Sequence, residues 1–132
     1  MKRILVADDS TATRTLVSAA LIGMENVEIL RVSTGLEALK LISGLQIDLV
    51  LTDIHMPEIN GLELVRMIRS GEKTRQTPIV VMSTESGMDD RQRSVLSGAD
   101  DFLAKPFTAG ELRGVIETHL KPCDRRQGTG DR

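Results

Sequence analysis

The strongest constraint on the fold of this chain is the regular alternation of short apolar runs with helical patterns. Five runs have the nearly continuous hydrophobicity of strands that are buried on both faces, at residues 3–7, 28–32, 48–52, 78–82 and 101–104. Five strand-then-helix units predict an α/β fold with a parallel sheet and helices on both of its faces. Right-handed crossovers leave few topologies for so short a chain, and the strand order 2-1-3-4-5 is a common one.

The segments between these runs carry apolar residues at helical spacing, as expected for helices that pack on a sheet. Ser10 or Thr11 is the predicted cap of the first helix, and Asn60-Gly61 opens the third. The expected buried stripes are Leu16, Val17, Ala20 and Leu21; Leu36, Leu39 and Ile42; Leu62, Val65 and Ile68; and Leu112, Val115, Ile116 and Leu120.

Two of the predicted helices have weak features. The fourth offers little to bury over residues 88–93, before Val95 and Leu96, so it is expected to be weakly anchored and able to shift. The last contains Gly110 and Gly114, each of which weakens a helix by about 1 kcal/mol relative to alanine.

The composition narrows the classes of partner and compartment. The chain has 132 residues with 40% hydrophobic content, which suits one domain at 1–120 followed by a polar, flexible tail at 121–132. A net charge of −2 and the lack of Trp and Tyr argue against nucleic-acid binding and against an anionic membrane surface. Cys123 is the only cysteine, which excludes an internal disulfide. No segment is long enough to span a bilayer, so a cytoplasmic location is expected.

Polar residues follow four of the five apolar runs. Asp8-Asp9 follows the first, Asp53 the third, Ser83 the fourth and Lys105 the fifth. The carboxyl ends of parallel strands meet at one edge of the sheet, and strands 1 and 3 are neighbours in the order 2-1-3-4-5. The three carboxylates are therefore expected to flank one crevice.

These residue types suit phosphoryl transfer assisted by a metal ion. Adjacent carboxylates repel each other, and Mg²⁺ (or Mn²⁺) relieves that repulsion through hard oxygen ligands. Asp53 is the expected nucleophile, Lys105 the neutralising ammonium and Ser83 a hydrogen-bond donor to a phosphoryl oxygen. Taken singly, each residue has a plain alternative: a turn or cap for the acidic pair, an ordinary strand end for Asp53, a helix cap for Ser83 and a solvated side chain for Lys105. Pro106 argues against an unconstrained loop at Lys105, because proline restricts the backbone of the residue before it and allows a cis peptide bond.

Taken together, these motifs resemble the response-regulator receiver domain of two-component signalling, most closely its single-domain chemotaxis type. The matching stretches are Asp8-Asp9-Ser10, Asp53-Ile54-His55-Met56-Pro57-Glu58-Ile59-Asn60-Gly61, Met82-Ser83-Thr84 and Gly98-Ala99-Asp100-Asp101-Phe102-Leu103-Ala104-Lys105-Pro106-Phe107. The match covers about residues 2–120. It implies a flavodoxin-like, doubly wound sheet of five strands with five helices.

The resemblance implies a role for each matching residue in the crevice. Asp53 would accept phosphate from a phosphohistidine of a sensor histidine kinase, or from a small donor such as acetyl phosphate. Asp9 and Asp53 would bind Mg²⁺ directly, Asp8 would bind it through water, and the main-chain carbonyl of His55 would be a further ligand. Lys105 would pair with the phosphoryl group.

It also implies a switch. Ser83 would turn toward the phosphoryl group, and Phe102 stands at the position of a switching aromatic ring, where the lack of a hydroxyl leaves only a steric in–out motion. His55 and Glu85 match positions that tune dephosphorylation. The fourth helix, fifth strand and fifth helix would form the face that binds a downstream protein.

Three alternatives remain open at this point. A metal-dependent phosphohydrolase is disfavoured, because those enzymes carry an Asp-x-Asp pattern after strand 1, where this chain has Asp8-Asp9-Ser10-Thr11. The protein is thus expected to be a self-phosphorylating switch with slow autodephosphorylation rather than a turnover enzyme. A binding module that works without phosphate is the second alternative. The third is a receiver cut from a longer regulator with an output domain.

Overall fold

The computed structural model describes residues 1–84 and 88–120, and it forms a five-stranded parallel sheet in the order β2-β1-β3-β4-β5, as predicted. The strands are β1 (Lys2–Ala7), β2 (Val27–Val32), β3 (Leu49–Asp53), β4 (Ile79–Ser83) and β5 (Asp101–Ala104). The helices are α1 (Thr11–Ala20), α2 (Gly35–Gly44), α3 (Gly61–Ser70), α4 (Met88–Ser97) and α5 (Ala109–Leu120). The predicted tail at 121–132 lies outside the described residues.

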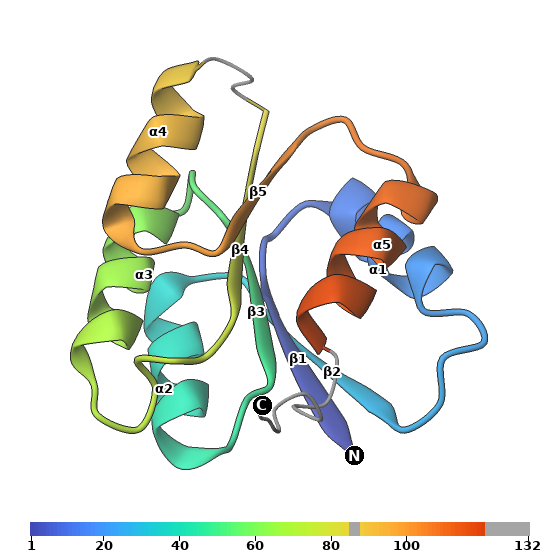
Figure 1. Ribbon diagram of the computed structural model, residues 1–132, viewed down its shortest axis with the longest axis horizontal. Helices are drawn as coiled ribbons and strands as arrows, with labels where there is room; N and C mark the ends of the chain where they lie inside the picture. The colour runs from blue at the N-terminus through green and yellow to red at the C-terminus, as the bar shows by residue number, and fades with distance from the viewer. Residues whose placement is uncertain (85–87, 121–132) are drawn as a thin grey trace, which may run out of the picture.

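The sheet is covered on both faces, with α1 and α5 on one side and α2, α3 and α4 on the other (Figure 1). Alternate residues of β1 supply the two cores. Leu5 and Ala7 pack on the side of α2 and α3, while Ile4 and Val6 pack on the side of α1 and α5. All four are fully or almost fully buried, which explains why the strand reads as a continuous apolar run.

The strand boundaries differ from the predictions by at most one residue, and those of β5 agree with them. Asp53 and Ser83 are the last residues of β3 and β4 rather than the first residues after them. Ser10 caps α1 by accepting from the backbone N–H of Thr13, and Asn60 forms a capping box with Glu63 at the start of α3. The Lys105–Pro106 peptide bond is cis.

Two predicted apolar stripes were partly wrong. Leu36 is 45% exposed, whereas Ile42 of the same predicted stripe is buried, together with Ala38. The error is larger in α4, where Val95 and Leu96 are 64% and 85% exposed. The face of α4 that packs on the protein is polar and small, with Asp90, Ser94 and Ser97 buried at helical spacing.

The buried serines of α4 satisfy their hydroxyls within the helix. Ser94 Oγ donates to the carbonyl of Asp90 at 2.8 Å, and Ser97 Oγ donates to the carbonyl of Arg93 at 2.8 Å. Small residues of this kind let α4 lie close to its neighbours without an apolar stripe. The expectation that α4 buries little hydrophobic surface is therefore correct, although the expected contact residues were not.

Arg69 ties two connecting segments, the one before β4 and the one before β5, to the end of α3. Its guanidinium donates to the carbonyls of Gly98, Arg75 and Thr77 at 2.8, 3.0 and 2.7 Å, and to Asp100 Oδ2 at 2.8 Å. Asp100 Oδ2 also accepts from the backbone N–H of Ile79 at 2.8 Å. One side chain thus joins α3, the start of β4 and the turn before β5.

Candidate functional site

The register of the sheet brings the ends of its central strands together. Ala7 in β1 lies opposite Thr52 in β3, and Asp53 lies opposite Met82 in β4. The backbone continues this pairing beyond the strand ends, because the N–H of Ile54 donates to the carbonyl of Met82 at 3.1 Å. The residues that follow these positions therefore share the carboxyl edge of the sheet, as the sequence predicted.

At this edge Lys105 reaches two carboxylates that are far apart in the sequence. Its Nζ lies 2.7 Å from Asp8 Oδ2 and 3.7 Å from Asp53 Oδ2. Asp8 is fully buried, and its Oδ1 accepts from the backbone N–H of Ser10 at 2.8 Å. The Lys105 side chain is only 14% exposed. The structure thus places an ammonium group between two acidic side chains in a largely desolvated crevice.

Asp53 is the carboxyl group that this environment perturbs. Burial raises the pKa of the Asp53 carboxyl above its ordinary value of 3.8. The Lys105 ammonium lowers the pKa, the Asp8 carboxylate raises it, and the backbone N–H and imidazole of His55 lower it by smaller amounts. Burial outweighs the attraction to Lys105, so the folded protein disfavours the charge on Asp53 and would gain from a further cation.

The backbone of Asp53 is fixed by the start of α3. The N–H of Gly61 donates to the carbonyl of Ile54 at 2.8 Å. A Cβ at Gly61 would lie 2.9 Å from the carbonyl carbon of Asp53 and 2.9 Å from the Cα of Ile54, and it would overlap the Asp53 carbonyl oxygen. Only glycine permits this approach. The position of Asp53 therefore depends on a residue eight places further along the chain.

Ser83 is buried at the end of β4, and its hydroxyl faces the fourth helix. Ser83 Oγ donates to Asp90 Oδ2 at 2.9 Å. The backbone carbonyl of Ser83 accepts from the N–H of Lys105 at 2.7 Å, which holds the two residues side by side at the edge of the sheet. Ser83 thus belongs to the same neighbourhood as Lys105, and its hydroxyl links the site to α4.

Phe102 is 7% exposed and packs into the core on the side of α2 and α3. The guanidinium of Arg91 in α4 lies over its ring, 4.9 Å from the centroid. This distance is within the range of a cation–π contact. The buried position of Phe102 is therefore covered by a charged side chain from α4.

Comparison with known proteins agrees with this geometry. Residues 4–117 match the family of the response regulator receiver domain. The chain belongs to this receiver family. It is 32% identical to a chemotaxis protein CheY homologue of Campylobacter jejuni over 89% of this chain and 92% of that protein.

Solved structures of other receivers share the fold. The chemotaxis response regulator CheY4 of Vibrio cholerae has a TM-score of 0.81 at 30% identity and covers 91% of this chain and 99% of its own. The receiver domain of a sensor histidine kinase from Pseudomonas aeruginosa has a TM-score of 0.80 at 27% identity, covers 90% of this chain and 97% of its own, and has a magnesium ion coordinated in its active-site cleft. This chain is thus a receiver of the CheY type, the phospho-accepting component of two-component signalling.

The acidic residues of this receiver offer a partial donor set for a divalent cation. Within residues 1–84 and 88–120, no three His, Cys, Asp or Glu side chains gather closely enough to hold a metal ion on their own. Of the predicted acidic residues, Asp8 and Asp53 both lie against Lys105, whereas Asp9 is exposed. Carboxylate oxygens supplemented by a carbonyl and water still fit Mg²⁺, which usually takes one or two carboxylates and keeps several waters.

The other predicted residues are placed as follows. His55 is exposed and lies next to Asp53, whose pKa it lowers through its backbone N–H and its imidazole. Glu85 lies outside the described residues. Two contacts of the site were missed from the sequence: Asp90 with Ser83, and Arg91 with Phe102. In the sequence, Asp90 and Arg91 belong to a polar stretch at the start of a helix. Such a stretch is also typical of a solvated surface, so it did not indicate these two contacts.

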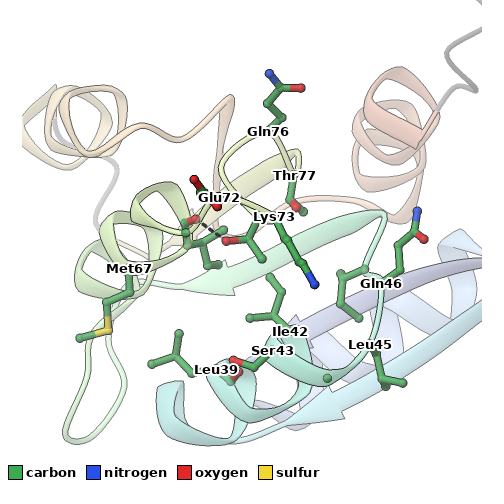
Figure 2. A pocket seen from close by; sticks show the side chains of 15 residues that line it. Leu39, Ile42, Ser43, Leu45, Gln46, Met67, Glu72, Lys73, Gln76 and Thr77 are labelled. Carbon is green, nitrogen blue, oxygen red and sulfur yellow. Dashed lines mark hydrogen bonds between the residues drawn. The ribbon is translucent and has the colours of Figure 1, made fainter.

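A large hollow of the receiver lies away from this crevice. A cavity of about 860 Å³ is lined by the ends of α2 and α3 and by the segments that lead into β3 and β4. Figure 2 shows Ile42, Met67 and Lys73 among the side chains around it. It borders the amino ends of β3 and β4, whereas the acidic crevice is at their carboxyl ends. Its lining includes none of the residues of the crevice.

Proposed function

We propose that Asp53 is the phospho-acceptor of this receiver and that Lys105 is its principal electrostatic partner. The observation that carries the proposal is the ammonium group 2.7 Å from Asp8 and 3.7 Å from Asp53 in a buried crevice. A phosphoryl group on Asp53 would bring oxygen atoms within reach of this ammonium. Lys105 would then exchange part of its contact with Asp8 for a contact with the phosphoryl group.

The reaction is an in-line displacement at phosphorus. A carboxylate oxygen of Asp53 attacks the phosphorus of a phosphohistidine on a sensor kinase, and an O–P bond forms as the N–P bond breaks. The bonding pair stays on the ring nitrogen of the leaving imidazole, which takes up a proton. Lys105 neutralises charge on the transferring oxygens. Asp9, Asp53 and the carbonyl of His55 would hold Mg²⁺, which supplies further charge neutralisation when bound.

The output is a conformational switch rather than turnover. Phosphorylation adds about −1.5 to −2 charges and strong acceptor oxygens, which attract the Ser83 hydroxyl. We infer that Ser83 and Phe102 relay this change to the face formed by α4, β5 and α5, and that a downstream protein binds there. The exposure of Val95 and Leu96 on α4 supports a partner at this face. His55 and Glu85 are proposed to affect the lifetime of the phosphoryl group.

The test is phosphate incorporation from acetyl phosphate, measured by intact mass with Mg²⁺ and with EDTA. We expect labelling of the wild type that requires the metal, and none of Asp53→Asn. Asp89→Asn is the matched control, because Asp89 is an exposed aspartate outside the crevice. Labelling of Asp53→Asn at the wild-type rate would refute the assignment of Asp53. A wild type that is labelled neither by acetyl phosphate nor by phosphorylated sensor kinases would instead favour a binding module that works without phosphate.

A further inference from the structure

The hydrogen bond between Ser83 and Asp90 joins a proposed switch residue at the end of β4 to the start of α4. Asp90 is 5% exposed and lies in the first turn of α4. Its Oδ2 accepts from Ser83 Oγ at 2.9 Å, and its Oδ1 lies 3.5 Å from Arg93 Nη1, whose side chain is 58% exposed. The neighbouring hydroxyl of Ser94 donates to the backbone carbonyl of Asp90 and so does not serve its carboxylate.

A buried carboxylate depends on its donors, and a serine hydroxyl has a single proton to donate. If Ser83 donates to a phosphoryl oxygen on Asp53, it no longer donates to Asp90. A buried charge that loses a donor is unfavourable, because water does not replace the lost contact. Asp90 then retains the longer contact with Arg93 at 3.5 Å, and a movement of the start of α4 would expose its carboxylate to solvent.

We propose that Asp90 is a positioning residue that competes with the phosphoryl group for the Ser83 hydroxyl and thereby couples phosphorylation to the position of α4. This inference rests on the proposed function and adds the residue that opposes activation. In the unphosphorylated protein, Asp90 holds Ser83 toward α4. In the phosphorylated protein, the phosphoryl oxygens take the same proton.

The next residue along the helix supports this coupling. Arg91 covers the buried ring of Phe102 at 4.9 Å, so consecutive residues of α4 contact both proposed switch residues. The helix has little apolar surface to resist displacement, since Val95 and Leu96 are exposed. Displacement of α4 therefore releases Ser83 and uncovers Phe102 in one motion.

The experiment measures the affinity of beryllofluoride, a mimic of the phosphoryl group, in the presence of Mg²⁺ by fluorine NMR on the full chain. Asp90→Ala removes the competing acceptor, so we expect beryllofluoride to bind roughly tenfold more tightly, the scale of one hydrogen bond to a charged group. Asp90→Asn keeps an acceptor without the charge, and we expect a smaller increase. Asp89→Asn removes a charge from the same helical turn and is expected to leave the affinity unchanged.

A double-mutant cycle separates positioning from a general structural effect. With Ser83→Ala as the background, Asp90→Ala has no hydroxyl to release, so the increase in affinity should disappear. An increase that persists in this background would overturn the inference, as would equal affinities for wild type and both Asp90 variants. Absence of binding by the wild type would overturn the proposed function and this inference with it.

Discussion

Replacing Gly61 with alanine tests whether the start of α3 positions the phospho-acceptor. Gly61 is the first residue of α3, where helix propensity alone favours alanine by up to about 1 kcal/mol. The structure predicts the opposite sign. An added Cβ would overlap the Asp53 carbonyl oxygen and lie 2.9 Å from two backbone carbons, whereas ordinary contacts begin near 3.4 Å.

The neighbours of this Cβ are backbone atoms, so no side-chain rotation relieves the overlap. The segment from Asp53 to Gly61 must shift by roughly 0.5 Å or more, and overpacking of this kind costs about 1–3 kcal/mol. We therefore expect Gly61→Ala to lower the free energy of unfolding by about 2 kcal/mol, and the melting temperature by roughly 5–10 °C. Phosphate incorporation should slow as well, because the displaced backbone carries the Asp53 carboxylate.

Urea denaturation followed by circular dichroism at 222 nm measures the stability. Gly114→Ala is the matched control, since Gly114 lies within α5 and its added Cβ would meet nothing within 4 Å beyond its chain neighbours and the nearby backbone of its own helix. We expect this variant to gain about 0.5–1 kcal/mol from helix propensity alone. If both alanine variants were more stable than the wild type, the steric argument for Gly61 would be refuted.

Three further perturbations test the electrostatics of the fold and the site. In EDTA at pH 7, Asp53→Asn should melt above the wild type. Burial raises the pKa of Asp53 in the folded protein, so the wild type loses stability as the pH rises through that pKa. The difference in melting temperature between Asp53→Asn and the wild type should therefore vanish in thermal melts below pH 3.8. Lys105→Met leaves Asp8 buried without its cation, so urea titrations should show a loss of about 3 kcal/mol in the free energy of unfolding. Mg²⁺ should reduce this loss, and an equal loss with and without Mg²⁺ would contradict the prediction. Arg69→Lys should lower the free energy of unfolding by about 2 kcal/mol, because lysine cannot replace the several N–H donors of the guanidinium. Arg66→Lys, at an exposed position of the same helix, is the control and should leave the stability unchanged.

The sequence predicted the sheet because buried parallel strands have an unmistakable pattern. Residues such as Leu5 and Val6 face opposite sides of the sheet and are both covered by helices, so both are apolar. The alternation of strands and helices left few topologies, and the common order 2-1-3-4-5 among them is the one observed. The carboxyl ends of β1, β3 and β5 then share one edge of the sheet, where Lys105 contacts Asp8 and Asp53.

The pattern was less informative where a helix packs through polar residues. Val95 and Leu96 were the thin apolar stripe expected on the weakly anchored α4, yet both are exposed, and Asp90 is buried instead. A period of apolar residues indicates a buried face only when burial is driven by the hydrophobic effect. In α4 a hydrogen bond to Ser83 and small serine side chains determine which face packs inward.

The sequence by itself determined the fold, the edge of the sheet where the site forms and the residues that could carry the chemistry, because these follow from strand periodicity and from the chain direction at each strand end. The tertiary structure decided which groups touch. It assigned Lys105 to Asp8 at 2.7 Å and Ser83 to Asp90 at 2.9 Å, and it left Asp9 exposed. These pairings depend on distances of a few tenths of an ångström across four separate segments, and local sequence patterns contain no information at that scale.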